Sequence, residues 1–318
     1  MTPQGPKVLF IMGWGRSGST ILDTLLGELD GFFSTGELHN LWRRGLMAGH
    51  TCGCGLAVTE CEVWSAVLSV AHRTSSGESI GPAQVVKWQR EAARTKHTPR
   101  LLRVAPGHLQ SWPALGSYTE LLGRVYSELG RATGARVLID SSKRPAHGAV
   151  LRLVPGIDPY VVHLVRDPRA VAYSRRRGKS GLDRDLRPTG ALESTSGWVV
   201  RNLASEAVSR RYGPGRSLLV RYEEFVGQPL ATIRSIARLV DERADAPSFN
   251  DHSSTLGLNH TVAGNPSRFI RGTITLKEDD AWIAHQSRAD RLEATALALP
   301  LLHRYGYSMR PAARVGER

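Results

Sequence analysis

The feature that most constrains this chain is a glycine-rich stretch that follows a short apolar run near its beginning. Residues 13–20 read Gly-Trp-Gly-Arg-Ser-Gly-Ser-Thr. Gly13 and Gly18 have the spacing of the G-x-x-x-x-G-K-[ST] loop, which cradles phosphates between a strand and a helix. Position 19, where that motif has its lysine, is serine here, and the positive charge lies at Arg16. The stretch therefore predicts an anion site at a helix N-terminus, without the ammonium group that reaches the β- and γ-phosphates of ATP or GTP.

Three further apolar runs indicate buried strands. They occupy residues 136–140, 160–165 and 217–222, and each is followed by turn residues and a helical pattern. Apolar strands that alternate with helices are typical of parallel sheets. The chain is therefore predicted to be an α/β protein with a three-layer, P-loop-like parallel sheet flanked by helices. Ligands of such sheets bind beyond the carboxyl ends of the strands, so the residues directly after each run are the candidate site.

A long stretch without strand patterns, at about residues 38–130, separates the first two predicted strands. It has helical patterns at 84–95 and 117–133, and we interpret it as a helical cap inserted into a single domain of residues 1–308. Further helices are predicted at 191–212, 228–241 and 288–304.

Two polar segments predict irregular structure. Residues 175–188 contain glycine and many charges, and we interpret them as a mobile loop. This loop is either simply solvated or a lid that steers an anionic donor. The tail at 309–318 is predicted to be disordered.

The composition excludes several classes of protein. A hydrophobic content of 41% in 318 residues supports a sizeable core, and no run approaches the roughly 18 apolar residues of a membrane span. The first apolar run is too short for a signal peptide, and three cysteines make no disulfide framework. We therefore expect a cytoplasmic protein without a membrane span.

The charge indicates an anionic ligand without identifying it. The net charge is +13, and only six of the 42 basic residues are lysine. A GC-rich genome is one cause of such arginine dominance. A polyanionic ligand is another, because the planar guanidinium matches phosphate and sulfate oxygens. Helix-turn-helix, zinc-finger and RNP signatures are missing from the sequence, so we expect no nucleic-acid partner.

A second anion-binding pattern follows the strand predicted at 160–165. Arg166 stands at the tip of this strand, and a helix is predicted to begin near Pro168, because proline at the first helical turn leaves no N–H unsatisfied. Ser174 lies about two turns along that helix. An arginine and a hydroxyl on one wall predict a pocket for a phosphate monoester.

Together these motifs resemble the PAPS-dependent sulfotransferase family, whose donor is 3′-phosphoadenosine 5′-phosphosulfate. In that family the first loop holds the 5′-phosphosulfate, and the arginine–serine pair holds the 3′-phosphate. A third match, Gly264-Asn-Pro-Ser-Arg-Phe269, resembles a late loop that bacterial members fold over the nucleotide. The resemblance implies that PAPS is the donor and PAP the product. It implies donor-binding roles for Gly15, Arg16, Ser17, Gly18, Ser19, Thr20, Arg166, Ser174, Asn265 and Arg268.

Sulfuryl transfer is expected to resemble phosphoryl transfer, an in-line displacement dominated by positioning and charge stabilisation. Arg16, with the loop amides, is placed to neutralise charge on the leaving oxygen. Lys143, at the end of a predicted strand, shares that role by analogy with related enzymes. In the alternative interpretation, Asp140 and the serines at 141 and 142 only cap the next helix. No γ-phosphate needs a magnesium bridge, so no metal is expected.

The acceptor hydroxyl needs a general base. Residues 35–39 resemble the segment where several sulfotransferase branches place a catalytic glutamate. Glu37 is the predicted base, since a carboxylate near a hydroxyl takes up its proton during attack. His39 is the alternative, and a further possibility is that Glu37 only pairs with a neighbouring arginine.

Two sets of residues keep alternative interpretations. Cys52, Cys54 and Cys61, flanked by His50, are either buried free thiols, a zinc clamp for the cap, or a redox sensor. Trp14 and Trp42 line an apolar acceptor pocket or pack in the core.

The sequence thus predicts a bacterial sulfotransferase of secondary metabolism that moves a sulfuryl group from PAPS to the hydroxyl of a small molecule or carbohydrate. A small-molecule kinase on the same fold is one alternative, although it would need a lysine at position 19. A basic nucleic-acid- or anion-binding protein is another, and its binding would weaken steeply with salt.

Overall fold

The structure is a computed structural model that describes residues 5–73, 77–177, 188–243, 249–250 and 252–309. Its centre is a five-stranded, all-parallel sheet with the strand order β2-β3-β1-β4-β5. The strands are β1 (Lys7–Gly13), β2 (Phe32–Ser34), β3 (Val137–Lys143), β4 (Asp158–Val165) and β5 (Ser217–Arg221). The predicted α/β class and parallel sheet are confirmed. Strand β2 was not predicted, because three residues are too few to show a pattern.

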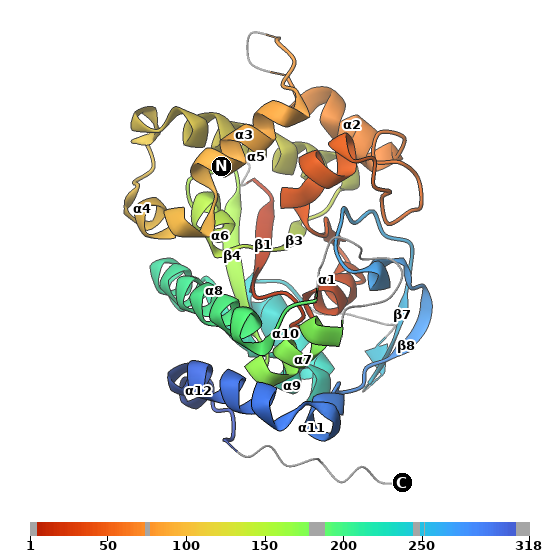
Figure 1. The fold of residues 1–318 in the computed structure, drawn as a ribbon. Helices are drawn as coiled ribbons and strands as arrows, with labels where there is room; N and C mark the ends of the chain where they lie inside the picture. The colour runs from red at the N-terminus through yellow and green to blue at the C-terminus, as the bar shows by residue number, and fades with distance from the viewer. Residues whose placement is uncertain (1–4, 74–76, 178–187, 244–248, 251, 310–318) are drawn as a thin grey trace.

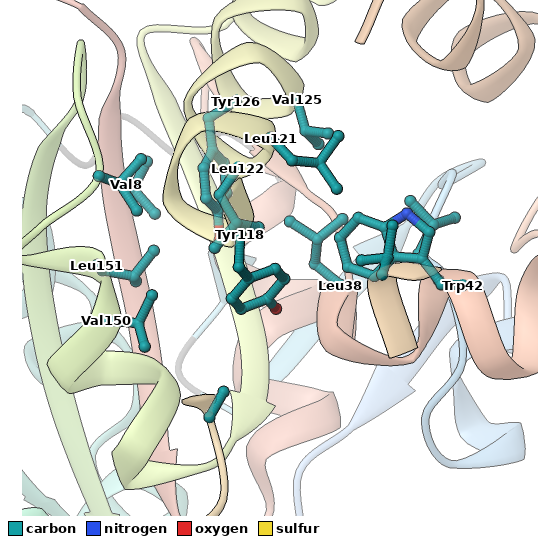
Figure 2. Packing of buried hydrophobic residues seen from close by; sticks show 14 of the residues in the cluster. Val8, Leu38, Trp42, Tyr118, Leu121, Leu122, Val125, Tyr126, Val150 and Leu151 are labelled. Atoms are coloured by element: carbon teal, nitrogen blue, oxygen red, sulfur yellow. The ribbon is translucent and has the colours of Figure 1, made fainter. Parts of the chain in front are cut away.

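The central strand β1 is buried on both faces, as an internal parallel strand must be. Successive side chains of a strand point to opposite faces. Val8, Phe10 and Met12 therefore pack into one apolar cluster, whereas Leu9 and Ile11 pack into another. Figure 2 shows part of the first cluster, where labelled side chains come from β1, the cap helices and the helix after β3.

Helices cover both faces of the sheet (Figure 1). One face packs against α5 and α6 through the first cluster, the other against α1, α9 and α10 through the second, and α7, α8 and α12 form a third cluster beside the sheet. The bounds are α1 (Ser19–Gly27), α5 (Pro113–Thr133), α6 (Pro145–Leu151), α7 (Pro168–Arg177), α8 (Ala191–Tyr212), α9 (Tyr222–Gly227), α10 (Pro229–Leu239) and α12 (Arg288–Arg304).

The chain between β2 and β3 is helical, as predicted for residues 38–130. Its helices share the first apolar cluster with β1, so this stretch is packed on the sheet and does not stand apart from it. Before α5 it contains η1 (Leu38–Asn40), η2 (Leu41–Met47), α2 (Glu62–Ala71), α3 (Pro82–Ala92), η3 (Thr95–His97), α4 (Thr98–Arg103) and η4 (Leu109–Ser111).

The part of the chain before α12 contains a small antiparallel sheet that was not predicted. Its strands are β6 (Phe249–Asn250), β7 (Ser253–Leu256) and β8 (Gly272–Thr275), and it is accompanied by η5 (Pro266–Phe269) and α11 (Ala281–His285). The predictions for most of the loop 175–188 and for the tail lie outside the described residues. Among the helices that the structure describes, none combines the length and apolarity that crossing a bilayer requires.

Candidate active site

A cavity of about 440 Å³ lies where the sequence predicted the site, beyond the carboxyl ends of the parallel strands. Its walls come from the glycine-rich loop between β1 and α1, the end of β3, Arg166 after β4, and the segment before η5. Figure 1 shows that α7 and α8 lie near the loop. The cavity thus joins all three motifs on which the functional prediction rests.

The glycine-rich loop needs glycine where it turns. At Gly13, with φ 145°, a Cβ atom would lie 2.2 Å from the carbonyl oxygen of Leu164. At Gly18, with φ 84°, it would lie 2.5 Å from the ring of Tyr222. Without these side chains the loop packs on β4 and α9 and keeps its backbone close to the cavity.

The loop lines the cavity with most of the residues predicted for it, namely Gly15, Arg16, Gly18, Ser19 and Thr20. Ser17 is buried instead, and its hydroxyl has no hydrogen-bond partner among the described residues. Arg16 has a left-handed backbone, with φ 72°. For a residue other than glycine this costs on the order of 1–3 kcal/mol, and such strain clusters at functional sites.

Arg166 and Ser174 both line the cavity, as predicted. The Arg166 guanidinium donates to the carbonyl oxygen of Arg16 at 3.1 Å, which links the two predicted anion sites. It also donates to the carbonyl and the carboxylate of Asp279, at 2.8 and 3.0 Å, and it stacks over Tyr222. A bound phosphate would therefore compete with a half-exposed carboxylate for Arg166.

The late loop is only partly where the resemblance placed it. Gly264, Asn265 and Ser267 line the cavity, and the Asn265 side chain accepts a hydrogen bond from the Ser267 amide. Arg268, for which the resemblance implied a donor-binding role, does not join them at the cavity. Its guanidinium is buried, lies outside the cavity lining, and donates to the carbonyl oxygens of Thr261 and Thr51 at 2.7 and 2.8 Å.

Glu37 and Lys143 meet across the cavity wall. The Lys143 ammonium donates to Oε1 of Glu37, and Oε2 accepts a hydrogen bond from the Asn40 amide at 2.6 Å. Burial opposes ionisation of Glu37, but the charge and hydrogen bond of Lys143, with help from Arg44 and Asn40, outweigh it and lower the pKa of Glu37. The Glu37 carboxylate is thus ionised at neutral pH and paired with Lys143, with Arg44 close enough to stabilise its charge as well.

Lys143, like Arg16, has a left-handed backbone conformation, with φ 65°. The strand register with β1 shifts just before it. This irregular end of β3 turns the Lys143 side chain into the cavity, where the predicted role requires it.

His39, the alternative base, lies outside the cavity lining. Its buried ring packs against the His147 ring, with the two ring planes perpendicular. Its Nδ1 atom has no hydrogen-bond partner among the described residues. Burial and nearby arginines hold the pKa of His39 well below its ordinary value. The structure therefore favours Glu37 over His39 as the group that reaches a ligand.

The residues before Lys143 have a structural role other than the predicted capping. Ser141 donates to buried Asp23 at 2.9 Å, and Ser142 donates to buried Asp140. Arg144 holds the N-cap position of α6. Burial raises the pKa of Asp23 to about 7 and that of Asp140 to about 6. Through the hydrogen bond between them, Asp140 holds Ser142, which lines the cavity.

The two tryptophans differ. Trp14 lines the cavity, stacked with Arg175 and Arg201 at 4.8 and 5.3 Å from its ring centre. Trp42 is fully buried and donates to His72 at 2.9 Å, so of its two interpretations the structure supports core packing.

The sequence did not single out a basic wall. Arg43, Arg144 and Arg201 line the cavity, and among the described residues no carboxylate forms an ion pair with any of them. Burial, together with the charges of Arg144 and Arg175, lowers the pKa of Arg201 to about 10. Arg201 lies mid-way along α8, where nothing in the local sequence shows which way a side chain points.

The three cysteines converge on a histidine that the sequence gave no reason to suspect. Cys52, Cys54 and Cys61 are free thiols beside His260, whereas the flanking His50 is exposed and lies outside the group. Cys52 and Cys61 are buried, but Cys54 is only half-buried.

Comparisons with known proteins identify the family. The model of the sulfotransferase family matches residues 6–245. Human carbohydrate sulfotransferase 6 is 37% identical over 100 residues, which cover 26% of this chain and 25% of that protein. Mouse carbohydrate sulfotransferase 2 is 29% identical over 119 residues, covering 26% and 22%. The chain thus spans about a quarter of the length of these curated relatives.

Solved structures share the fold. The sulfotransferase domain from the Synechococcus PCC 7002 olefin synthase superposes with a TM-score of 0.56 at 21% identity, covering 97% of this chain and 98% of that domain. The sulfotransferase domain from the curacin biosynthetic pathway has a TM-score of 0.50 at 17% identity, covering 96% and 99%.

Proposed function

Since this chain belongs to the sulfotransferase family, we propose that it transfers a sulfuryl group from PAPS to an acceptor hydroxyl, and that PAP leaves as the product. The observation that carries the proposal is the single cavity that joins the glycine-rich loop to the wall of Arg166 and Ser174. A donor with a phosphosulfate at one end and a 3′-phosphate at the other needs two anion sites in one cavity.

The residues present fit this donor. Backbone amides of the loop and the N-terminus of α1 favour an anionic group, and Arg16 adds a full charge beside them. Arg166 is buried, and its Nε atom has no partner among the described residues, so it keeps a donor available for a phosphate oxygen. The donor supplies the activated sulfuryl group, and the chain supplies its orientation.

Arg16 and Lys143 are the residues proposed to stabilise the negative charge of the leaving group. Both side chains line the cavity at the loop end, where charge would build on the oxygen that leaves with the 5′-phosphate. Lys143 contacts Glu37 in the structure. An anionic donor offers the Lys143 ammonium a second partner, and a shift toward it would release the Glu37 carboxylate.

Glu37 is the proposed general base. Its ionised carboxylate faces the cavity and accepts a hydrogen bond from Asn40, which holds it in place. A carboxylate with a lowered pKa is a weak base, so it acts by taking up the proton as the acceptor oxygen attacks, not before.

The arginines of the basic wall indicate what kind of acceptor the cavity binds. Arg144 and Arg201 add positive charge beyond what the two predicted phosphate sites require. We infer that the acceptor is a carbohydrate or small molecule with an anionic group near the reacting hydroxyl. The similarity of this chain to carbohydrate sulfotransferases supports a carbohydrate as the acceptor. A cytoplasmic location remains a prediction from the sequence.

The proposal is tested by incubating the protein with radiolabelled PAPS and a panel of neutral and acidic oligosaccharides and phenols. Label in an acceptor, with an equal amount of PAP released, is the expected result. Transfer of phosphate from Mg-ATP to an acceptor, with PAPS left intact, would contradict the proposal and favour the kinase alternative.

A further inference from the structure

Four side chains outside the cavity, three thiols and one imidazole, converge closely enough to hold a metal ion. The Sγ atoms of Cys52, Cys54 and Cys61 and a ring nitrogen of His260 all lie within 4.8 Å of one another. His260 Nδ1 is 3.2 Å from Cys61 Sγ and 3.9 Å from Cys52 Sγ. In a tetrahedral zinc site, bonds of about 2.3 Å to sulfur and 2.0–2.1 Å to nitrogen place neighbouring ligand atoms about 3.5–3.8 Å apart. The four ligand atoms thus lie within about 1 Å of the spacing that a zinc site requires.

The backbone holds the ligands in place. Cys52 donates its amide to Leu56 at 2.8 Å, and Cys61 donates to Ala57 at 2.9 Å, so the chain turns back on itself between the thiols. The His260 carbonyl accepts from the Trp64 indole at 2.7 Å, and Phe33 stacks on the His260 ring. Cys52, Cys61 and His260 are therefore each held by a contact that does not involve the metal.

The segment that carries the cysteines and the segment that carries His260 approach so closely that no side chain fits between them at Gly53. A Cβ atom on Gly53 would lie 2.0 Å from the Asn259 side-chain oxygen. The Gly53 amide donates to Thr261 at 2.9 Å, and Cys52 forms a bridge with Val262. Segments about 200 residues apart in sequence thus lie side by side, as the red-orange and blue parts of Figure 1 show.

Simpler explanations leave part of this arrangement unexplained. A disulfide would use two thiols and leave the third beside an imidazole. Small apolar thiols would not need to converge on a histidine. Three thiolates and one zinc ion carry a net charge of −1, and buried Arg268 bonds to Thr51 and Thr261 on either side of the group. Its cation is thus placed to offset that charge.

We propose that Cys52, Cys54, Cys61 and His260 bind one structural zinc ion that clamps the cap to the segment before η5. Four protein ligands leave no open position, which is the mark of a structural and not a catalytic site. The clamped segment leads directly into the cavity. Val262 bonds through its backbone to Thr35 and Glu37, and Gly264 lines the cavity wall. The zinc would thereby hold the late loop beside the proposed base, although the proposal does not depend on the reaction.

The direct test is the zinc content of the wild-type protein, purified under reducing conditions from zinc-supplemented medium and measured by mass spectrometry. One zinc ion per chain is expected. The metal-free, reduced protein titrated with Co²⁺ alone is expected to develop the visible absorption of tetrahedral, thiolate-bound cobalt. A wild-type protein that contains no zinc and binds neither metal would overturn the proposal, whatever the variants do.

Variants identify the ligands. His260→Ala is expected to weaken zinc binding more than about 100-fold, beyond the 10–100-fold typical of a residue that only orients a ligand. Cys61→Ser is expected to lose the metal and part of the cobalt charge-transfer band. His50→Ala is the matched control, because this histidine is a near neighbour in sequence but exposed and outside the group. Unchanged zinc affinity in both ligand variants would also overturn the proposal.

Discussion

Replacing Glu37 by glutamine tests the proposed base with the loss of one charge and little change of shape. Glutamine keeps an oxygen for the Asn40 amide, which lies 2.6 Å from Glu37, but it cannot take up a proton from the acceptor hydroxyl. General bases contribute roughly 10²–10⁴-fold. The kcat of Glu37→Gln is expected to fall by that factor, which corresponds to about 3–5 kcal/mol of activation free energy.

The same change affects stability and donor binding differently. The Glu37 and Lys143 side chains are 16% and 17% exposed, so the free energy of unfolding is expected to fall by about 1–2 kcal/mol, between the values for exposed and buried pairs. PAP affinity is expected to hold or rise, because a negative charge leaves an anion site. The double variant Glu37→Gln/Lys143→Gln is expected to regain stability without regaining turnover.

The assay is transfer of label from saturating radiolabelled PAPS to the acceptor that turns over fastest in the panel. Asp279→Asn is the matched control. It also removes one carboxylate charge from the cavity wall, but at the predicted 3′-phosphate site, so it is expected to keep most of its kcat. Turnover of Glu37→Gln at the wild-type rate would refute the reasoning.

Three other perturbations have expected outcomes. Arg166→Ala removes charge-assisted hydrogen bonds worth about 1.5–3 kcal/mol each, so calorimetry is expected to show a roughly 10–150-fold loss of PAP affinity with little change for 5′-AMP; equal losses would place the 3′-phosphate elsewhere. Arg201→Ala is expected to raise KM for an acidic acceptor but not for its neutral analogue, and a rise for both would remove Arg201 from acceptor recognition. Burial raises the pKa of Asp23 to about 7, so protonated Asp23 favours folding. This stabilisation is fully present below the unfolded pKa of about 3.9 and is lost as the pH rises to 7, by about 1.4 kcal/mol per pH unit. Asparagine does not titrate, so the free energy of unfolding of Asp23→Asn, measured with urea, is expected to rise relative to that of wild type between about pH 4.5 and pH 7. A difference in unfolding free energy that stays constant with pH would show that Asp23 does not titrate in this range.

The parts of the fold with strong local signals were predictable. Helix α8 spans the predicted residues 191–212, and α12 spans 288–304, because each is long and bounded by residues that end helices. The glycine-rich loop was found since its turn depends on glycine at Gly13 and Gly18, where neighbouring atoms exclude a side chain. The antiparallel strands β6 to β8 are short, and they gave no comparable pattern.

Side-chain direction limited the prediction of the site. The late motif lies at the cavity, but Arg268 turns away from it to join two backbone segments. Trp42 follows the proposed base in sequence yet points into the core. His260 lies 199 residues from Cys61, so no spacing rule connects them. Such contacts depend on how distant segments pack, which a local pattern does not contain.

The measurement that tests the central claim most directly is calorimetric binding of PAP, 5′-AMP and Mg-ATP to the purified protein, because it needs no knowledge of the acceptor. The account predicts a marked preference for PAP, without any magnesium requirement, from a cavity that joins two anion sites. Tighter binding of Mg-ATP than of PAP would contradict it.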